Sequence, residues 1–347
     1  MGELVKAAIL VEQNAPLEVS GIELPDELDY GQVRVRLAWS GVCGAQLNEI
    51  QGAKGPDRFL PHLLGHEGSG VVEAIGPGVS TVAEGDRVVL HWRPSAGIQC
   101  RPPSYDWDGR RVNAGWVTTF NQAAVVSENR LTPIPESFDM RLAPLLGCAV
   151  TTGLGVISNE AQVRIGESVV VLGVGGVGLT VVQGAAMASA NPVVAVDVHA
   201  NKLDLASRFG ATHAVRSSDD LHERVLEVVG ESGADVVVET TGIPALIESA
   251  YELAGPQGRT ILVGVPPKGK NVHLYTLPLH FRKVLKGTEG GGAVPDRDIP
   301  RYIALHEAGR LELDPLVTAA YTLDTINDAI DDMRAGRIAG RCVVDLS

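Results

Sequence analysis

The chain has 347 residues, more than one hydrophobic core usually organises, so two domains are expected. Its composition, 45% hydrophobic and 20% charged, is that of a globular protein and excludes a mostly disordered chain. The net charge of −13 argues against a nucleic-acid partner, because phosphate binding requires a basic surface.

The N-terminal segment and the cysteines indicate a cytoplasmic protein. The first apolar stretch is short and is interrupted by charged residues, which does not fit a signal peptide, and no run of about 18 apolar residues predicts a membrane span. The four cysteines lie far apart, at Cys43, Cys100, Cys148 and Cys342. This spacing suits metal binding or burial better than a disulfide framework.

The N-terminal part of the chain has the pattern of a small β-rich domain. Residues 32–39 alternate apolar side chains with Arg34 and Arg36, which is the period of a half-buried strand. Residues 68–92 alternate apolar runs with Gly-Pro-Gly and Glu-Gly-Asp turns. This pattern favours a barrel-like set of strands over βαβ units.

From Glu167 onward, apolar runs alternate with helical segments. The runs at residues 168–174, 193–198, 234–240 and 258–265 predict buried strands separated by helices. This order is typical of a doubly wound parallel sheet. The last fifty or so residues predict two amphipathic helices and a closing strand.

A glycine-rich turn follows the first of these strands and opens a helix. Its sequence is Gly173-Val174-Gly175-Gly176-Val177-Gly178, a G-x-G-x-x-G motif. The glycines permit a tight turn and a close backbone approach to a pyrophosphate, and the helix N-terminus favours its negative charge. Asp197 ends the next strand, where a carboxylate can bind the ribose hydroxyls of NAD and repel the 2′-phosphate of NADP. An NAD site is predicted, the alternative for Asp197 being a cap at a strand end.

Three residues that can hold a metal occur in short glycine-containing segments: Cys43 in G-V-C-G, His66 in G-H-E and Cys148 in G-C-A-V. Two thiolates and an imidazole fill three positions of a tetrahedral zinc site and leave the fourth open. Each residue alone is weak evidence, because a buried cysteine is often only a small core residue. That alternative applies to Cys148, and also to Cys100 and Cys342.

These segments resemble the zinc-dependent medium-chain alcohol dehydrogenases along the whole chain. The G-H-E-x-x-G segment with the glycines and the G-D-x-V strand that follow it is the most specific part, and the coenzyme half most resembles the glutathione-dependent formaldehyde dehydrogenase branch. The resemblance implies an α/β protein with a β-rich GroES-like catalytic domain, residues 1–149 and 291–347. A Rossmann NAD-binding domain, residues 150–290, would interrupt it, with zinc and nicotinamide meeting in the cleft between the two.

The resemblance also implies roles for individual residues. Cys43, His66 and Cys148 would be the ligands of the catalytic zinc, and Glu67 would be a nearby carboxylate that can approach the metal. Arg341 falls where the family has an arginine near the coenzyme pyrophosphate. Two further coenzyme contacts are expected at Thr152 and Lys202.

The chain departs from the family after the G-D-x-V strand, where many members hold a structural zinc with four cysteines. Residues 91–116 contain only Cys100, and one thiolate cannot build such a site. A single zinc per subunit is therefore predicted, with a proline- and tryptophan-containing loop in place of the structural lobe.

The usual proton relay is also missing. Ala45 stands where the family has a hydroxyl, and Asn48 stands where it often has a histidine. Gln46 replaces the usual aspartate, and we expect it to accept a hydrogen bond from His66. His91 is a candidate replacement base, the alternative being a solvent-exposed histidine at a strand end.

Basic side chains predict a polar, anionic substrate. By family position Lys54 projects toward the outer substrate channel, with Arg58 close behind, and Ala45 and Trp92 would line the pocket. The segment replacing the structural lobe adds Arg93 and Arg101, so positive charges are expected at the entrance. The alternative is that these are ordinary solvated surface charges.

The resulting hypothesis is a reversible, zinc- and NAD-dependent oxidation of a sugar-like or cyclitol-like alcohol to a carbonyl. A zinc-retaining reductase of an activated C=C bond and a non-catalytic nucleotide-binding protein are the alternatives. The expected partners are a small-molecule substrate and a second copy or further copies of the chain, as a homodimer or homotetramer, with neither nucleic acid nor membrane.

Overall fold

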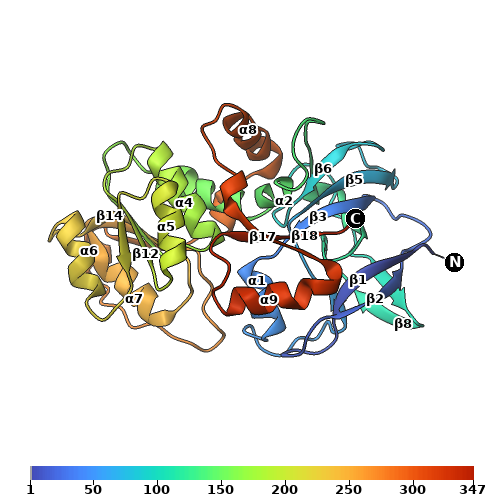
Figure 1. Ribbon diagram of the computed structural model, residues 1–347, viewed down its shortest axis with the longest axis horizontal. Coiled ribbons are helices and arrows are strands. Elements are labelled where there is room, and N and C mark those ends of the chain that lie inside the picture. Colours follow the sequence, from blue (N-terminus) through green and yellow to red (C-terminus); the bar gives the residue numbers. More distant parts are fainter. Residues whose placement is uncertain (1) are drawn as a thin grey trace. The chain divides into compact units, whose positions relative to one another are not determined.

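The structure, a computed structural model, describes residues 2–347 in two compact units. One unit comprises the chain up to Cys148 together with Val294–Ser347, and the other comprises Ala149–Ala293 (Figure 1). The first is β-rich and the second alternates strands with helices, which confirms the predicted α/β class. No helix within residues 2–347 is long and apolar enough to cross a bilayer.

Two groups of strands build the first unit (Figure 1). A closed barrel has the strand order β1-β2-β7-β8-β4: β1 (Leu4–Leu10), β2 (Glu18–Glu23), β7 (Ser104–Trp107), β8 (Arg110–Asn113) and β4 (His62–Leu63). A seven-stranded sheet has the order β10-β6-β5-β3-β18-β17, with β9 also paired to β3: β10 (Leu131–Pro133), β6 (Arg87–Leu90), β5 (Gly68–Ile75), β3 (Gln32–Gly41), β18 (Arg341–Asp345), β17 (Val317–Thr322) and β9 (Ala123–Ser127). The α-helices of this unit are α1 (Gly44–Ile50), α2 (Ala143–Leu146), α8 (Pro295–Glu307) and α9 (Ile326–Arg334).

Strand β3 has the predicted period of two. Val33, Val35 and Leu37 are at most 2% exposed and belong to the core of this unit, whereas Arg34 and Arg36 are only partly buried. Alternate side chains of a strand point to opposite faces of the sheet, so one face of β3 is apolar and the other carries charge. The C-terminal end of β3 leads directly into the candidate site.

The prediction of a loop in place of the structural lobe is only partly correct, because β7 and β8 form a hairpin of the barrel. Asp108 and Gly109 connect the two strands with positive φ angles of 51° and 77°, and Asp-Gly favours such a turn between paired strands. Tyr105, Trp107 and Val112 are at most 3% exposed and form part of the barrel core. Apolar packing therefore holds the hairpin in place.

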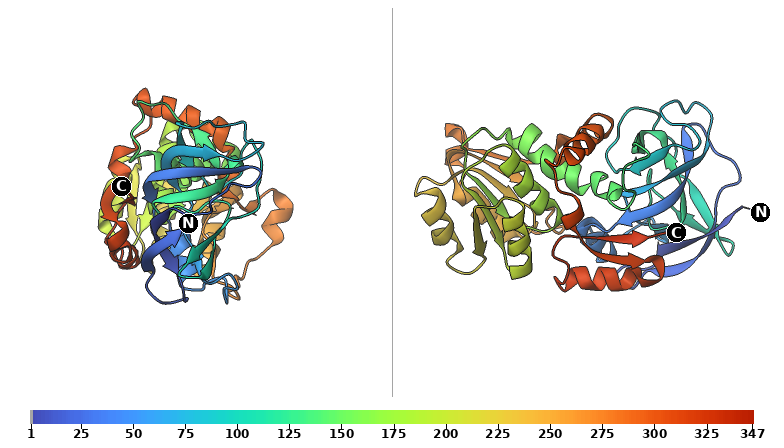
Figure 2. Two further views of the ribbon diagram at one scale, coloured as in Figure 1. Left: turned by 90° about the vertical axis from the view of Figure 1, so that its right-hand side faces the viewer. Right: turned by 45° about the horizontal axis from the view of Figure 1, so that its top comes forward.

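The second unit is a parallel sheet of six strands covered by helices. The strand order is β13 (His213–Arg216), β12 (Val193–Asp197), β11 (Val169–Leu172), β14 (Ala234–Glu239), β15 (Ala254–Leu262) and β16 (Val284–Gly287). Its α-helices are α3 (Ala149–Gly155), α4 (Gly176–Met187), α5 (Ala200–Arg208), α6 (Leu221–Val229) and α7 (Pro244–Leu253). Helices α4 and α5 pack together, as do α6 and α7, and the two pairs flank the sheet (Figures 1 and 2). The strand order reverses between β11 and β14, which is where doubly wound sheets bind ligands.

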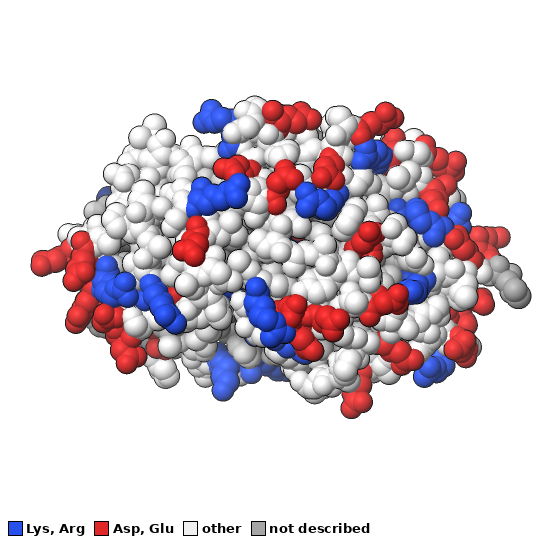
Figure 3. Space-filling model, viewed as in Figure 1, with Lys and Arg blue, Asp and Glu red and all other residues white. Residues whose placement is uncertain are grey.

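Surface charge shows no single-sign region on the face seen in Figure 3. Acidic and basic side chains alternate across that face. A broad basic surface of the kind that binds a phosphate backbone is therefore not formed on the face in view.

Candidate functional site

Two cysteines and a histidine meet in the first unit. Cys43 lies between β3 and α1, His66 lies between β4 and β5, and Cys148 follows α2. One ligand atom from each, two sulfurs and a ring nitrogen, lie within 4.8 Å of one another. Ligands on a tetrahedral zinc ion are about 3.5–4 Å apart, given bond lengths of about 2.0–2.3 Å. The three side chains are therefore close enough together to share one ion.

The imidazole of His66 is held by Gln46 on one side only. Nδ1 lies 2.6 Å from the amide nitrogen of Gln46, whose Oε1 accepts a hydrogen bond from the Cys43 backbone N–H at 2.9 Å. Nε2 of His66 is buried and has no hydrogen-bond partner among the described residues. An orphaned imidazole nitrogen beside two thiols fits a zinc ion, which prefers sulfur and nitrogen ligands.

The thiol of Cys43 favours the thiolate form that binds metals. Its pKa lies well below the usual range chiefly because Cys148 donates a hydrogen bond to it, with smaller contributions from His66 and Arg341, although burial acts in the opposite direction. The site is therefore prepared electrostatically for a cation.

Beside this cluster Glu67 and Arg341 form a buried ion pair. Glu67 is 0% exposed and Arg341 is 4% exposed. Two glycines pack against Glu67: a Cβ on Gly41 would lie 2.8 Å from its carboxylate carbon, and one on Gly147 would lie 3.1 Å from its Cα and Cβ. A charge buried this deeply requires a partner, and Arg341 supplies it.

The glycine-rich turn of the second unit connects β11 to α4. Gly173 has a φ of +87°, and a Cβ on Gly178 would lie 2.0 Å from the Gly173 carbonyl oxygen, so α4 approaches the strand as only glycine allows. A Cβ on Gly175 would meet no atom within 4 Å, which leaves the outer face of the turn open. This open turn at a helix N-terminus fits a pyrophosphate group.

Asp197 lies where the sequence predicts it, at the end of β12. It is 9% exposed, and its carboxylate accepts hydrogen bonds from the backbone N–H groups of Val174 and His199, both at 3.0 Å. The carboxylate is thereby fixed to the glycine-rich turn. Thr152 is buried in α3 and Lys202 is half-buried in the first turn of α5, and their coenzyme contacts remain predictions.

Comparison with known proteins agrees with this geometry. Residues 29–136 match the alcohol dehydrogenase GroES-like domain family and residues 176–307 match the zinc-binding dehydrogenase family. The chain is 34% identical to an NDMA-dependent alcohol dehydrogenase of Amycolatopsis methanolica, over 96% of each chain. The chain belongs to the zinc-dependent alcohol dehydrogenase family. It is an enzyme of that family, whose members use zinc and NAD(H).

Other relatives of this alcohol dehydrogenase include an S-(hydroxymethyl)glutathione dehydrogenase of Paracoccus denitrificans, 30% identical over 95% of this chain and 97% of the relative. Among solved structures, an alcohol dehydrogenase zinc-binding domain protein from Burkholderia ambifaria has a TM-score of 0.91 and 30% identity over 99% of each chain. Benzyl alcohol dehydrogenase from Acinetobacter calcoaceticus has a TM-score of 0.89 and 27% identity over 99% of this chain and 100% of that one. These neighbours confirm the predicted pairing of a GroES-like and a Rossmann-like domain.

Both readings of His91, an exposed histidine and a replacement base, conflict with its surroundings in this alcohol dehydrogenase. It is 1% exposed, Nδ1 donates to the Arg93 carbonyl at 2.8 Å, and Nε2 lies 2.9 Å from the Thr132 hydroxyl. Burial lowers its pKa to about 4. With both nitrogens occupied and a low pKa, His91 is a structural residue and a poor general base.

The basic residues predicted at the entrance do not all lie together. Lys54 and Arg58 are exposed on the segment after α1, whereas Arg93 stacks near Trp92 at 5.8 Å. Arg101 lies at the far end of β3 from the metal site, and its place at the entrance stays a prediction. Its carbonyl accepts a hydrogen bond from Gln32, the first residue of β3, and the metal site follows the other end of this strand, about 30 Å away at about 3.3 Å per residue.

Sequence reasoning missed Glu239 at the end of β14. This carboxylate is 0% exposed and accepts hydrogen bonds from the backbone N–H groups of Thr241 and Gly242, while Thr240 Oγ1 donates to the Gly173 carbonyl at 2.7 Å. The side chains after β14 thus hold the glycine-rich turn at the switch point of the sheet. An acid followed by two threonines and a glycine directly after an apolar strand is the signal that could have revealed them.

Proposed function

We propose that this enzyme catalyses the reversible, NAD-linked oxidation of an alcohol to a carbonyl at a single zinc per subunit. The observation that carries the proposal is the orphaned Nε2 of His66 beside the thiols of Cys43 and Cys148. Three protein ligands leave one tetrahedral position for substrate.

Each residue of the site has a separate role in this proposal. Cys43, His66 and Cys148 would hold zinc, which supplies a Lewis acid that lowers the pKa of an alcohol hydroxyl. Arg341 neutralises Glu67. The hydrogen bond from Cys148 lowers the pKa of Cys43, and the charge of Arg341 adds to this effect. The open turn at Gly175 would take the pyrophosphate of NAD, and the nicotinamide ring of the same coenzyme would accept the hydride. Asp197 would select NAD against NADP.

Metal analysis and coenzyme reduction test this proposal together. We expect purified protein to contain one zinc per chain after desalting and to reduce NAD with a primary or secondary alcohol. Replacing Cys148 by Ser should remove both properties, since one lost thiolate destabilises the whole ligand set. NAD reduction at an undiminished rate by zinc-free protein would contradict the assignment.

The missing proton relay supports an alternative activity, the reduction of an activated C=C bond. Ala45 is exposed and has no hydroxyl, and Asn48 does not titrate, so neither can carry a proton from the substrate. Reduction of an activated C=C bond is therefore the second candidate activity. Incubation with NADH and an enal separates the two, because alcohol dehydrogenation in reverse yields an unsaturated alcohol and the alternative yields a saturated aldehyde.

The proposed substrate is a polar, anionic alcohol such as a sugar or cyclitol derivative. Lys54 and Arg58 support it, because both are exposed close to the helix that follows Cys43. Replacing Lys54 by Ala should lower kcat/KM for a phosphorylated polyol about tenfold and leave the neutral polyol unaffected. A kcat/KM for hexanol equal to that for the phosphorylated polyol would overturn this choice of substrate.

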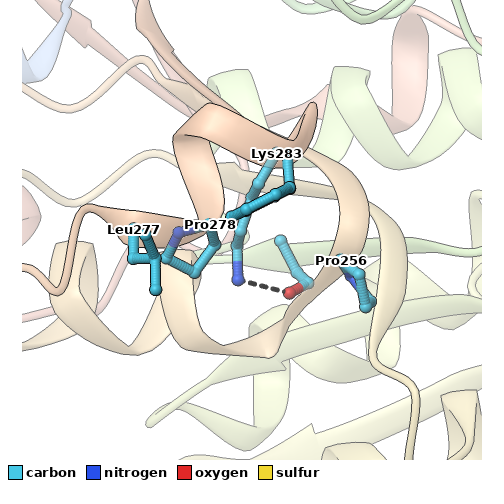
Figure 4. Close-up of a pocket in the computed structure, with 6 residues that line it drawn as sticks. Pro256, Leu277, Pro278 and Lys283 are labelled. Carbon is cyan, nitrogen blue, oxygen red and sulfur yellow. Dashed lines mark hydrogen bonds between the residues drawn. The ribbon is translucent and has the colours of Figure 1, made fainter.

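The proposed assembly is a homodimer formed through the second unit. The proposed location is the cytoplasm. Strand β16 is an edge strand of the parallel sheet, and the segment before it exposes Tyr275, Leu277 and Phe281. Leu277, Phe281 and Pro278 line a pocket of 360 Å³ in which Lys283 donates to the Ala254 carbonyl at 2.6 Å (Figure 4). An open strand edge next to apolar side chains suits a second copy of the same edge. Light scattering should give a dimer that Phe281→Glu converts to a monomer, and a monomeric unmutated protein would contradict it.

A further inference from the structure

A second group of potential metal ligands lies apart from Cys43, His66 and Cys148. Glu49 in the last turn of α1, Asp57 in the following loop and His62 in β4 each present a ligand atom within 4.8 Å of the others. All three belong to the first unit, and nothing in the proposed reaction uses them.

The imidazole of His62 faces an acceptor on both sides. It is 7% exposed, with Nδ1 2.9 Å from the Leu63 carbonyl oxygen and Nε2 2.8 Å from Oδ2 of Asp57. A carbonyl oxygen only accepts, so Nδ1 carries a proton, and a neutral imidazole then has none left for Asp57. Either a second proton or a metal cation must lie between Nε2 and the carboxylate. A ring N–H bound to a backbone carbonyl is also the arrangement that orients metal-binding histidines.

The two carboxylates favour the metal cation over the proton. Glu49 is half-buried, and no hydrogen bond or ion pair of its carboxylate is found among residues 2–347. Arg58 stacks on Phe59 at 5.0 Å, and neither it nor Lys54 pairs with Glu49 or Asp57 in the described chain. One imidazolium charge balances only one of the two carboxylates, whereas a divalent cation balances both.

The loop that carries these ligands is held in place before any ion binds. Oδ1 of Asp57 accepts from the Phe59 N–H at 2.8 Å, which turns Oδ2 toward His62. Asn113 fixes the same loop by donating to the Phe59 carbonyl at 2.8 Å. The ligands thus require little reorganisation on binding.

We propose that Glu49, Asp57 and His62 form a second cation site that takes a divalent transition-metal ion through two carboxylate oxygens and Nε2 of His62. This donor set lacks thiolates, so the ion exchanges readily and is lost on desalting, unlike the zinc held by two cysteines. Because Glu49 lies on α1 and Asp57 lies in the loop after it, the ion ties the helix to the segment that carries Lys54 and Arg58.

Cobalt binding to desalted, zinc-containing protein tests the proposal. Equilibrium dialysis should show one Co²⁺ per chain, with visible ligand-field absorption and no thiolate-to-cobalt charge transfer, and the thermal midpoint should rise. His62→Gln and Glu49→Gln should each weaken binding at least tenfold. Glu49→Gln guards against misfolding, because the Glu49 carboxylate makes no hydrogen bond or ion pair within residues 2–347. Glu12→Gln, at an exposed carboxylate outside the cluster, should bind Co²⁺ as the unmutated protein does.

Three outcomes would overturn the proposal. They are absence of Co²⁺ binding to the zinc-containing protein, binding accompanied by the thiolate charge-transfer band, and binding that Glu49→Gln leaves unchanged. The last would assign the ion to other surface carboxylates.

Discussion

Gln46 faces His66 with its amide nitrogen, which lies 2.6 Å from Nδ1 of the imidazole. The prediction that Gln46 accepts this hydrogen bond is therefore wrong for this orientation, because an amide N–H donates. A neutral His66 then carries its proton on Nε2, the nitrogen that a metal needs. Metal binding requires the amide to turn over, and its oxygen then gives up the bond from the Cys43 N–H.

A carboxylate at position 46 would remove this conflict. Because both of its oxygens accept, Gln46→Glu can bond to Cys43 and to His66 at once, and we expect zinc to bind about tenfold more tightly. Competition with a chromophoric chelator measures the change. Asn48→Asp adds the same charge two residues along α1, and equal tightening by both variants would assign the effect to charge alone.

Loss of one thiolate should empty the site. We expect Cys43→Ser to retain less than a tenth of the zinc of the unmutated protein, measured by elemental analysis after desalting. Cys100→Ser is the matched control, because Cys100 is buried beside Ser127 and belongs to neither metal-capable cluster. Two zinc ions that survive desalting would contradict the single-site proposal.

Coenzyme choice should depend on Asp197. A carboxylate fixed to the glycine-rich turn repels the 2′-phosphate of NADP, and Asp197→Ser should lower the NAD preference in kcat/KM about a hundredfold. Asp204→Ser, on the exposed face of α5, should keep the original ratio. If the unmutated enzyme has equal kcat/KM for NAD and NADP, Asp197 is only a cap at the strand end.

Acid should destabilise the first unit through His91. Its pKa of about 4 lies below the ordinary value of 6.5, so the unfolded chain binds a proton that the folded chain refuses between these pH values. The stability from this group is complete above pH 6.5 and falls by about 3 kcal/mol by pH 4. Urea unfolding between pH 6.5 and pH 4 should show that His91→Gln loses less unfolding free energy than the unmutated protein does. The exposed His273→Gln variant should behave as the unmutated protein does.

The hairpin of β7 and β8 should contribute to the stability of the barrel. Trp107 is 2% exposed and donates to the Ser20 hydroxyl at 3.0 Å, and Trp107→Ala should cost about 3–5 kcal/mol of unfolding free energy. Trp116 is 42% exposed, so Trp116→Ala should cost less than about 1 kcal/mol. Equal losses would mean that the hairpin does not depend on its buried face.

Periodicity and glycine spacing predicted the fold well because both are local. Alternation in β3 reflects burial of one face of that strand, and the apolar runs of β11, β12 and β14 reflect burial of both faces. Both patterns involve only neighbouring residues in the sequence. The β7–β8 hairpin was not predicted, although Asp108-Gly109 is a local turn signal between its two short strands.

Contacts between distant residues could not be predicted in the same way. The burial of His91 depends on Thr132, 41 residues away, and the orientation of Gln46 depends on His66, 20 residues away. Arg341 was expected at the coenzyme, and the structure pairs it with Glu67, a partner that no local pattern indicates. Residue type was enough to select the candidate site residues. Their hydrogen-bond and ion-pair partners depend on the packing of the folded chain.

The β7–β8 hairpin also bears on how the enzyme responds to metal shortage. Neither metal-capable cluster among residues 2–347 includes a side chain of this hairpin, which Tyr105, Trp107 and Val112 anchor in the barrel core. A chelator should therefore abolish activity while the β7–β8 hairpin keeps its packing in the barrel core. Zinc-free protein should then regain activity when the ion is added back, without refolding of the hairpin.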